Sequence, residues 1–513
     1  MSTTLIRGGD VITMDDATHA APVRTDIRIS DGRITQIGPD LQAQPGEEVI
    51  DARGLLITPG FVNAHTHSWE YFFKGRYDNL PLELWMLGSY PILGAGRMSP
   101  DLIRLRSLMF AMESMKAGVT TLIDDVLETP GQDADQLAAV VDAYADIGIR
   151  ANVSGHVINR PFVDTLPFVA DWLPDDLVRE VRAMPTLTAD EYLDFSRAAF
   201  ERHHGTAGGR IRYMLAPSGP QRCTDDLIVG ATQLAVQHDA EVHVHVLETK
   251  TQAVTGDELY GGRTLVQHLD EIGALSERTT FAHGIWVTDD DIERIARAGV
   301  SVSHNAISNL KLGSGILPWR RYRDAGVNLG LGTDGCSSSD SPRLMDVMKT
   351  AALLHKISEP DFERWPTAPE VLSAATIGGA RSGVLDHAVG SLEVGKRADL
   401  VMFDTETLAF MPRNHLENQL VYSENGSSIV RVMVDGVVTV ENGRLTQIDE
   451  GAVIAAFREE MPAIREEQDR LDEINAVFAP AFARMHAETS ARAMPVNRWS
   501  GDESAWVREA AAV

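Results

Sequence analysis

The sequence predicts an α/β fold in which a (β/α)8 barrel is joined to a small β-sandwich built from both ends of the chain. Two observations predict this fold. Short apolar runs alternate with helix-length amphipathic stretches along the middle of the chain, which indicates a parallel sheet with helical crossovers. Alternating, turn-rich segments lie on both sides of that region. The expected parts are 1–58 and 385–449 for the sandwich, 59–384 for the barrel and 450–513 for a helical extension.

The N-terminal part is predicted to form short strands and turns. Its residues 4–16, 25–38 and 47–60 alternate in hydrophobicity and are broken by Gly, Asp and Pro. Residues 390–404 and 429–445 show the same pattern. We therefore expect the two ends of the chain to pair in space.

The middle region provides about eight strand-and-helix units, which favours a closed barrel over an open sheet. Helical patterns cover 99–118 and 224–240. The strand-like runs after the first one are 118–125, 149–157, 211–218, 240–248, 279–285, 300–305 and 327–334. The charged, helical tail after 450 is expected to serve packing or assembly.

Bulk composition excludes several classes of partner. The chain of 513 residues has 46 Lys+Arg against 74 Asp+Glu, a net charge of −28, which argues against nucleic acid and anionic membrane surfaces. Only Cys223 and Cys336 are present, as in a cytosolic protein with reduced thiols. The N-terminus lacks the pattern of a signal peptide, and no apolar run is long enough for a membrane span. We expect a cytoplasmic enzyme, and a homo-oligomer (dimer or higher).

The first chemical signal is His65 and His67 at the end of the apolar run that starts the barrel. Residues i and i+2 of a strand point to the same side, so both imidazoles can bind one metal ion. An incidental surface pair is the competing interpretation.

The second signal is the alternation of His243 and His245, followed by Glu248. His245 is the better ligand candidate because it lies nearer the carboxyl end of its strand, where barrel active sites form. His243 lies deeper and is expected to be an interior histidine. Glu248 follows closely enough to lean over a metal-bound water.

The third signal is Asp334, which closes an apolar run and has Gly332 and Gly335 near it. An ordinary strand-to-turn aspartate is the competing interpretation for this residue alone. His283 and His304 also close strand-like runs, and both are expected to face the same pocket. These candidate residues lie at the ends of successive strands of the predicted barrel, which favours one shared site.

Eight segments together resemble the amidohydrolase superfamily, and more narrowly its cytosine-deaminase-related subgroup. That subgroup includes triazine hydrolases, guanine deaminase and methylthioadenosine/S-adenosylhomocysteine deaminase. The resemblance covers about residues 1–448. Its motifs are GFVNAHTH, KGRYDNLPLELWML, AGVTTLIDD, VHVHVLET, FAHGIWVTDDDI, SHNAISNLKLGSG, GLGTDG and GSLEVGKRADLV.

The resemblance implies the same barrel and β-sandwich, and it assigns roles by motif position. It implies catalytic roles for Glu248 and His283, and it places His304 and Asn309 at the substrate pocket. The implied metal ligands are His65, His67, His245 and Asp334.

Binuclear relatives carry a lysine at the end of the fourth strand, and none occurs in 211–222. The resemblance therefore implies one divalent ion, zinc being favoured and Fe²⁺ or Mn²⁺ also fitting. Ile92 and Leu93 replace an acidic residue linked to ribose binding, and Ser218 begins the stretch that replaces a histidine motif. Trp69 is expected to form an aromatic wall for the substrate.

These features predict a hydrolase that cleaves a C–N bond of a small N-heteroaromatic molecule by deamination or amine release. A metal-activated water is expected to attack, with Glu248, Asp334 or both taking its proton and His283 stabilising the negative charge. Glu248 then returns the proton to the leaving nitrogen. The alternatives are hydrolysis of an acyclic amide, urea or carbamate, hydrolytic dechlorination at the same site, and a metal-binding protein without catalysis.

Overall fold

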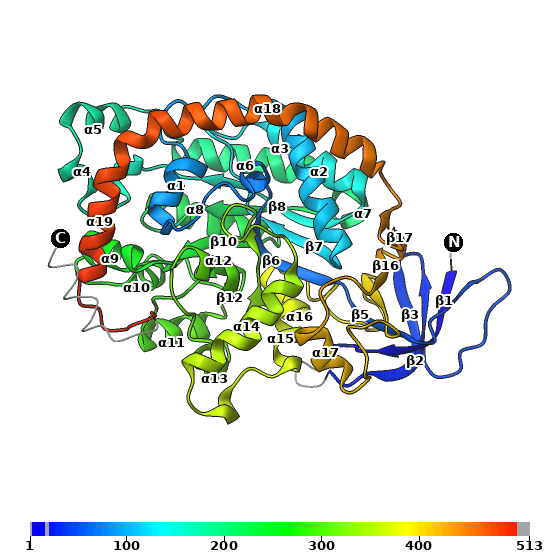
Figure 1. Ribbon diagram of the computed structural model, residues 1–513. Coiled ribbons are helices and arrows are strands. Elements are labelled where there is room, and N and C mark those ends of the chain that lie inside the picture. Colours follow the sequence, from blue (N-terminus) through cyan, green and yellow to red (C-terminus); the bar gives the residue numbers. More distant parts are fainter. Residues whose placement is uncertain (1–2, 16–19, 500–513) are drawn as a thin grey trace.

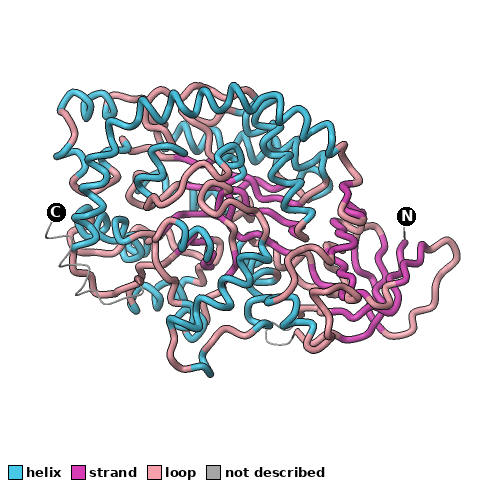
Figure 2. Tube along the Cα trace, viewed as in Figure 1, coloured by secondary structure: helices cyan, strands magenta, loops and turns pink. Residues whose placement is uncertain are grey.

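The computed structural model describes residues 3–15 and 20–499 of the chain. These residues form two sheets together with the helices around them. Figure 1 shows most helices gathered around the larger sheet, with the smaller sheet beside it, and Figure 2 shows the strands of both sheets in magenta.

The larger sheet is a parallel barrel. Its neighbouring strands follow chain order from β6 to β13, and β14 returns to pair with β6. Most of these strands are buried along their whole length, as strands covered on both faces require. They are β6 (Phe61–His67), β7 (Val119–Asp124), β8 (Arg150–Val157), β9 (Ile211–Pro217), β10 (Val242–Val246), β11 (Thr279–His283), β12 (Ser301–His304), β13 (Leu329–Leu331) and β14 (Asp334–Gly335).

The eighth position of the barrel is filled by two short strands in succession. β13 pairs with β12, and β14 pairs with β6 two residues further along the chain. The backbone between them is held by Asn63, whose amide donates to Thr333 Oγ1 at 2.7 Å and whose oxygen accepts from Thr333 N at 3.0 Å. This side-chain clamp closes the barrel at the point where Asp334 begins.

Helices surround the barrel, and local sequence explains their ends. Asp133 forms a capping box with Gln136 at the start of α3, and Gly148 ends that helix with a φ of 87°. The predicted helical stretches 99–118 and 224–240 contain α2 and α8. The barrel helices are α2 (Pro100–Lys116), α3 (Ala134–Ile147), α6 (Ala189–His203), α8 (Asp225–Gln237), α9 (Lys250–Leu259), α10 (Leu265–Glu271), α11 (Asp289–Ala298), α13 (Trp319–Asp324), α14 (Leu344–Ser358), α15 (Ala368–Ala375) and α16 (Ile377–Ser382).

Shorter helices lie in the loops. Several of them follow the carboxyl ends of the strands and so border the site described below. They are η1 (Ser68–Phe73), α1 (Leu82–Ser89), η2 (Phe162–Asp164), α4 (Val169–Trp172), α5 (Asp175–Arg182), α7 (Thr206–Gly209), α12 (Ala306–Lys311), η3 (Phe362–Arg364), α17 (Leu416–Tyr422) and η4 (Ala476–Phe478).

The smaller sheet joins both ends of the barrel sequence, because β15 (Leu400–Asp404) pairs antiparallel with β5 (Leu55–Pro59). Its apolar side chains, among them Ile6, Ile29 and Met402, form a separate core. The remaining strands are β1 (Thr3–Val11), β2 (Val23–Ser30), β3 (Arg33–Gly38), β4 (Glu48–Asp51), β16 (Ile429–Val434), β17 (Val437–Glu441) and β18 (Arg444–Leu445). The predicted fold class, a barrel with a β-unit from both chain ends, is confirmed.

The C-terminal extension forms two helices, α18 (Glu450–Asn475) and α19 (Ala479–Ala491). In Figure 1, α18 (orange) runs along the upper edge of the barrel and α19 (red) down its left side. Buried Asn475 accepts hydrogen bonds from the backbone N–H groups of Ile92 and Leu93, both at 2.9 Å, and donates to Leu93 O at 3.0 Å. The extension therefore holds the loop after α1. The part of the predicted extension from 500 to 513 lies outside the described residues.

No helix in the described part of the chain combines the length and the apolar character that a membrane crossing needs.

Candidate metal centre

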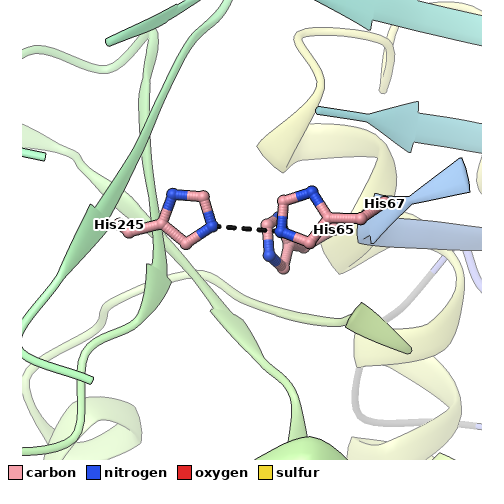
Figure 3. Close-up of side chains that lie close together, drawn as sticks. All are labelled: His65, His67 and His245. Carbon is pink, nitrogen blue, oxygen red and sulfur yellow. Dashed lines mark hydrogen bonds between the residues drawn. The ribbon is translucent and has the colours of Figure 1, made fainter. Parts of the chain in front are cut away.

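Four side chains from three barrel strands converge at the carboxyl ends of those strands. His65 and His67 close β6, His245 lies in β10, and Asp334 opens β14. All four are buried, and donor nitrogens of the three histidines lie within 4.8 Å of one another. Figure 3 shows the three imidazoles turned toward a common point.

The hydrogen bonds of His67 and His245 fix their tautomers. The Nδ1–H of His67 donates to Asp125 O at 2.7 Å, and the Nδ1–H of His245 donates to Ser218 O at 3.1 Å. Both Nε2 atoms then carry lone pairs, and they face each other at 3.2 Å. Two lone pairs at this distance repel, so the pair fits a cation held between them.

His65 is oriented by a relay from deeper in the barrel. Glu241 Oε1 accepts from His243 Nδ1 at 2.8 Å, so His243 Nε2 accepts from the Nδ1–H of His65, also at 2.8 Å. This leaves His65 Nε2 buried and, within the described residues, without a hydrogen-bond partner. Burial lowers the pKa of His65 to about 3, which keeps the ring neutral as metal binding requires.

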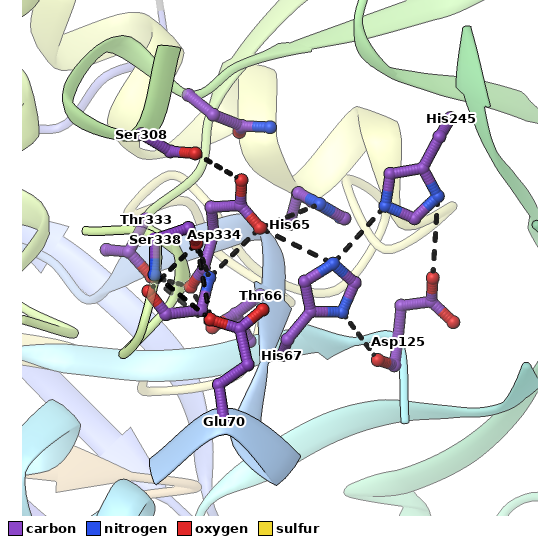
Figure 4. A network of polar contacts seen from close by, with 12 residues as sticks. His65, Thr66, His67, Glu70, Asp125, His245, Ser308, Thr333, Asp334 and Ser338 are labelled. Atoms are coloured by element: carbon purple, nitrogen blue, oxygen red, sulfur yellow. Dashed lines mark hydrogen bonds and ion pairs between the residues drawn. The ribbon is translucent and has the colours of Figure 1, made fainter. Parts of the chain in front are cut away.

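Asp334 supplies the carboxylate. Its Oδ1 lies 3.5 Å from His65 Nε2 and 3.4 Å from His67 Nε2, and its Oδ2 accepts from Ser308 Oγ at 2.6 Å (Figure 4). Burial alone would raise its pKa, but the imidazoles of His65, His283 and His67 lower the pKa well below the usual range. The group is therefore an anion, and the set of three imidazoles and one carboxylate fits one divalent ion such as Zn²⁺.

Glu248 and His283 stand beside this set. Glu248 Oε2 lies 3.5 Å from His283 Nε2, and Asp334 Oδ2 lies 3.9 Å from the same nitrogen. Burial raises the pKa of Glu248 well above its ordinary value, and the negative charge of Asp334 adds to the rise. His283 Nδ1 donates to Asn309 Oδ1 at 2.9 Å, which leaves its Nε2 as an acceptor facing Glu248. Proton-transfer groups thus adjoin the donor set.

Three residues at or just beyond the carboxyl ends of β10, β11 and β13 have left-handed backbones. The φ angles are 53° for Leu247, which precedes Glu248, 74° for His283 and 60° for Asp334. Such conformations are uncommon for residues other than glycine and cluster at functional sites. Here they turn the chain sharply at the points where the chemical side chains enter the pocket.

Sequence reasoning missed two acidic residues at the site. Glu70, in η1, accepts from the backbone N–H groups of Ser337 and Ser338, and burial raises its pKa to about 8. Asp125, just after β7, accepts from His156 Nδ1 at 2.9 Å and lies 3.8 Å from His245 Nδ1. Asp125 does close a strand-like run in the sequence, and Glu70 lies three residues after His67, so position could have indicated both.

The remaining candidates occupy different places. Trp69 lines the cavity beside the donor set, and Asn309 contacts His283. His304 is buried against His355, whose Nε2 lies 3.0 Å from its own, and its ring contacts Trp319. The structure therefore brings together His65, His67, His245, Glu248, His283 and Asp334 but directs His304 away from the cavity.

The cavity itself is small, about 50 Å³, and its rim includes Trp69, Tyr90, Leu127 and Leu312. This volume holds only a few water molecules. A hollow of about 440 Å³ lies beyond Trp69 and Leu127, between the loop after α1 and helix α18. A ring-sized molecule therefore has to displace side chains of the rim.

A barrel whose strand ends carry this donor set together with adjacent proton-transfer groups defines a metal-dependent hydrolase. The Amidohydrolase family matches residues 56–439. The chain belongs to the amidohydrolase family. The predicted resemblance and the predicted class, a hydrolase acting on C–N bonds, are both confirmed.

Known relatives are similar over nearly their whole length. The chain is 34% identical over 454 residues to a 5'-deoxyadenosine deaminase of Methanosarcina mazei, which covers 88% of this chain and 96% of that protein. It is 34% identical over 434 residues to a 5-methylthioadenosine/S-adenosylhomocysteine deaminase of Desulforudis audaxviator, covering 84% and 92%.

Solved structures give the same fold. An atrazine chlorohydrolase from Arthrobacter aurescens, complexed with zinc, is similar with a TM-score of 0.80 and 28% identity, covering 90% of this chain and 100% of that chain. An adenosine deaminase from Xanthomonas campestris with bound zinc is similar with a TM-score of 0.78 and 27% identity, covering 92% and 99%.

Proposed function

We propose that the chain is a hydrolytic deaminase of a small N-heteroaromatic amine, with one divalent ion, zinc being favoured, held by His65, His67, His245 and Asp334. The observation that carries the proposal is the placement of Glu248 and His283 beside the donor set, 3.5 Å apart and buried. The deaminase names of the relatives support the leaving group, ammonia.

His65, His67, His245 and Asp334 would hold a divalent ion, which would lower the pKa of a coordinated water to about 7 and so supply a nucleophile near neutral pH. Glu248 takes the proton of the attacking water as general base. Glu248 then returns the proton to the leaving nitrogen, and ammonia departs.

His283 has a second part in this chemistry. Its bare Nε2 faces Glu248 and Asp334, so the proton that Glu248 takes from water can pass to Nε2, forming an imidazolium, and return to Glu248 before ammonia leaves. That cation stabilises negative charge on the substrate oxygen or ring nitrogen as it develops. Asn309 holds the ring by accepting from Nδ1–H.

Little in this chain supports binding of the sugar that the named substrates of the relatives carry. Ile92 and Leu93 present apolar side chains, and the polar groups of their backbones are taken by Asn475. We therefore propose a base-like or otherwise sugar-free heterocycle as the substrate. The cytoplasmic location and the homo-oligomeric state remain predictions.

Hydrolytic dechlorination is the second candidate, because a similar structure is an atrazine chlorohydrolase. The same water and the same Glu248 would serve, with chloride as the leaving group. Ammonia and chloride release, measured over a panel of purines, pterins, amino-triazines and chlorotriazines with the zinc-loaded enzyme, separates the two. Ammonia release that is lost in Glu248→Gln supports the deaminase. Chloride release alone supports the second candidate, and activity only on anilides or phenylureas contradicts both.

A further inference from the structure

A buried arginine shares the cavity with the proposed catalytic groups and has no role in the mechanism above. Arg222 follows β9, in the loop that begins at Ser218, and only 6% of its surface is exposed. It lines the same cavity as His245, Glu248 and Asp334. Ser218 links it to the donor set, because Ser218 O accepts from His245 Nδ1 and Ser218 Oγ accepts from Arg222 Nη1 at 3.3 Å.

The guanidinium of Arg222 has only neutral partners. Besides Ser218 Oγ it contacts the sulfur of Met86, 3.3 Å from Nη2, and its buried Nε has no hydrogen-bond partner in the described part of the chain. No carboxylate of the described residues lies within ion-pair distance of it. Burying a cation without a counter-charge is costly, so this arrangement needs an explanation.

Other buried arginines of the chain show what is usual here. Arg28, Arg106 and Arg150 are as buried as Arg222, and each is paired with a carboxylate. The pairs are Arg28 with Glu47, Arg106 with Glu128, and Arg150 with Asp399 and Asp435. In the described residues, Arg222 is thus the buried arginine whose counter-charge is missing from the protein itself.

Glu248 lies on the same cavity, and the charge of Arg222 partly offsets the rise in the pKa of Glu248 that burial causes. It is not within ion-pair distance of the guanidinium, so it makes no direct pair with Arg222. The hydroxyl of Tyr90, whose ring stacks on Phe162, is a further polar group of this lining. Arg222 and Tyr90 therefore offer several hydrogen-bond donors toward the cavity and no acceptor charge.

We propose that Arg222, with Tyr90, binds a carboxylate carried by the substrate beside the amine-bearing ring. This inference rests on the proposed function and narrows its substrate class to N-heteroaromatic amines with an acidic substituent. A guanidinium matches a carboxylate with two parallel hydrogen bonds, and the low-exposure cavity strengthens such a pair. The net charge of −28 disfavours the approach of an anionic substrate, so a buried cation at the cavity would favour its binding there.

The test compares pterin with pterin-6-carboxylate, two amines that differ by one carboxylate, using the zinc-loaded full-length enzyme. We expect a higher kcat/KM for the carboxylate, and we expect Arg222→Met to remove that preference by roughly 10- to 100-fold through KM. Arg222→Lys should restore part of it. Arg212→Gln, which changes an arginine of β9 that does not line the cavity, is the matched control and should keep the preference.

A binding measurement distinguishes this inference from the proposed function. Calorimetric titration of pterin-6-carboxylate into Glu248→Gln, with and without Arg222→Met, measures carboxylate binding where turnover is blocked. Binding that depends on Arg222 without any ammonia release by the wild type supports the inference and contradicts the deaminase. Ammonia release from pterin and its carboxylate at equal kcat/KM, unchanged in Arg222→Met, overturns the inference and leaves the deaminase standing. Amines with a ring oxo group, such as xanthopterin, are a third set of substrates in this test. A higher kcat/KM for them than for pterin-6-carboxylate would also overturn the inference.

Stability provides a readout that a purely structural arginine would not give. Because the guanidinium is buried and uncompensated, Arg222→Met should raise the Tm of the ligand-free protein. A lower Tm of this variant would show that Arg222 serves packing, and would contradict the inference.

Discussion

His243 Nε2 lies 2.8 Å from His65 Nδ1, and this contact decides which nitrogen of His65 is free for a metal ion. The contact depends in turn on Glu241, which accepts from the Nδ1–H of His243 at 2.8 Å. Through this contact His243 orients a proposed ligand that lies on another strand, 178 positions away from it in the sequence.

Removing this relay should weaken metal binding without removing a ligand. We expect His243→Phe to lower the affinity for Zn²⁺ by roughly 10- to 100-fold, because the His65 ring loses the acceptor that fixes its tautomer. Competition with a zinc chelator measures the affinity. Unchanged affinity in this variant would mean that packing alone orients His65.

The proposed ligands should be required for the protein to retain zinc. Asp334→Asn replaces the anion at 3.4–3.5 Å from two imidazoles by a neutral amide, so we expect the zinc content after dialysis to fall to well below one ion per chain. Elemental analysis gives the number directly. Ser339→Ala, on the same loop but outside the donor set, serves as the control, and equal zinc in both variants would refute the assignment.

Glu248→Gln should separate metal binding from turnover. The amide cannot carry the proton between water and leaving group, so kcat on an active substrate should fall by roughly 10²- to 10⁴-fold while zinc content stays the same. Steady-state ammonia release together with elemental analysis checks both halves. Full activity in this variant would exclude the proton-transfer role.

The loop after α1 should depend on the C-terminal extension. Asn475→Ala removes the acceptor of two backbone N–H groups, at Ile92 and Leu93, and leaves them buried without a partner. The expected cost is about 1–3 kcal/mol in the free energy of unfolding. Denaturant unfolding measures it, and Asn414→Ala, at an exposed position, provides a comparison that should be nearly neutral.

Acid should destabilise the protein partly through His355. Burial lowers the pKa of His355 to about 3, whereas the unfolded chain takes up this proton near pH 6.5. The contribution of this group to stability is therefore present above pH 6.5 and is lost as the pH falls toward 3. Between pH 7 and pH 5 the wild type should lose about 2 kcal/mol more than His355→Gln. Parallel losses in the two proteins would show that His355 titrates normally.

The strand pattern was sufficient to predict the barrel and the place of the site. The four proposed ligands lie at or near the carboxyl ends of strand runs in the sequence: His65, His67, His245 and Asp334. Because the strands of a closed parallel barrel present these ends to one rim, the convergence follows from periodicity and topology. The pattern could not predict contacts that depend on loop paths. Glu70 reaches the site because η1 turns the chain back after β6, and Arg222 reaches the cavity through an irregular loop.

His304 marks a limit of reasoning from strand position. It closes β12 as His283 closes β11, yet the backbone of His283 is left-handed and that of His304 is not, and their rings take different directions. One buried ring faces Glu248, and the other lies against His355 and Trp319. Sequence patterns carry no information on such a change in backbone angle.

The hydrogen bonds between Asn475 and the loop after α1 also affect the order in which the parts of the site form during synthesis. Domains fold as the chain emerges, from the N-terminus onward. The barrel strands and all the proposed ligands are complete by Gly335, but the segment that fastens the rim is translated some 140 residues later. A ribosome-bound chain can therefore assemble the proposed metal donors while the wall of the cavity is still unfastened, and the enclosed pocket forms only after Asn475 has emerged.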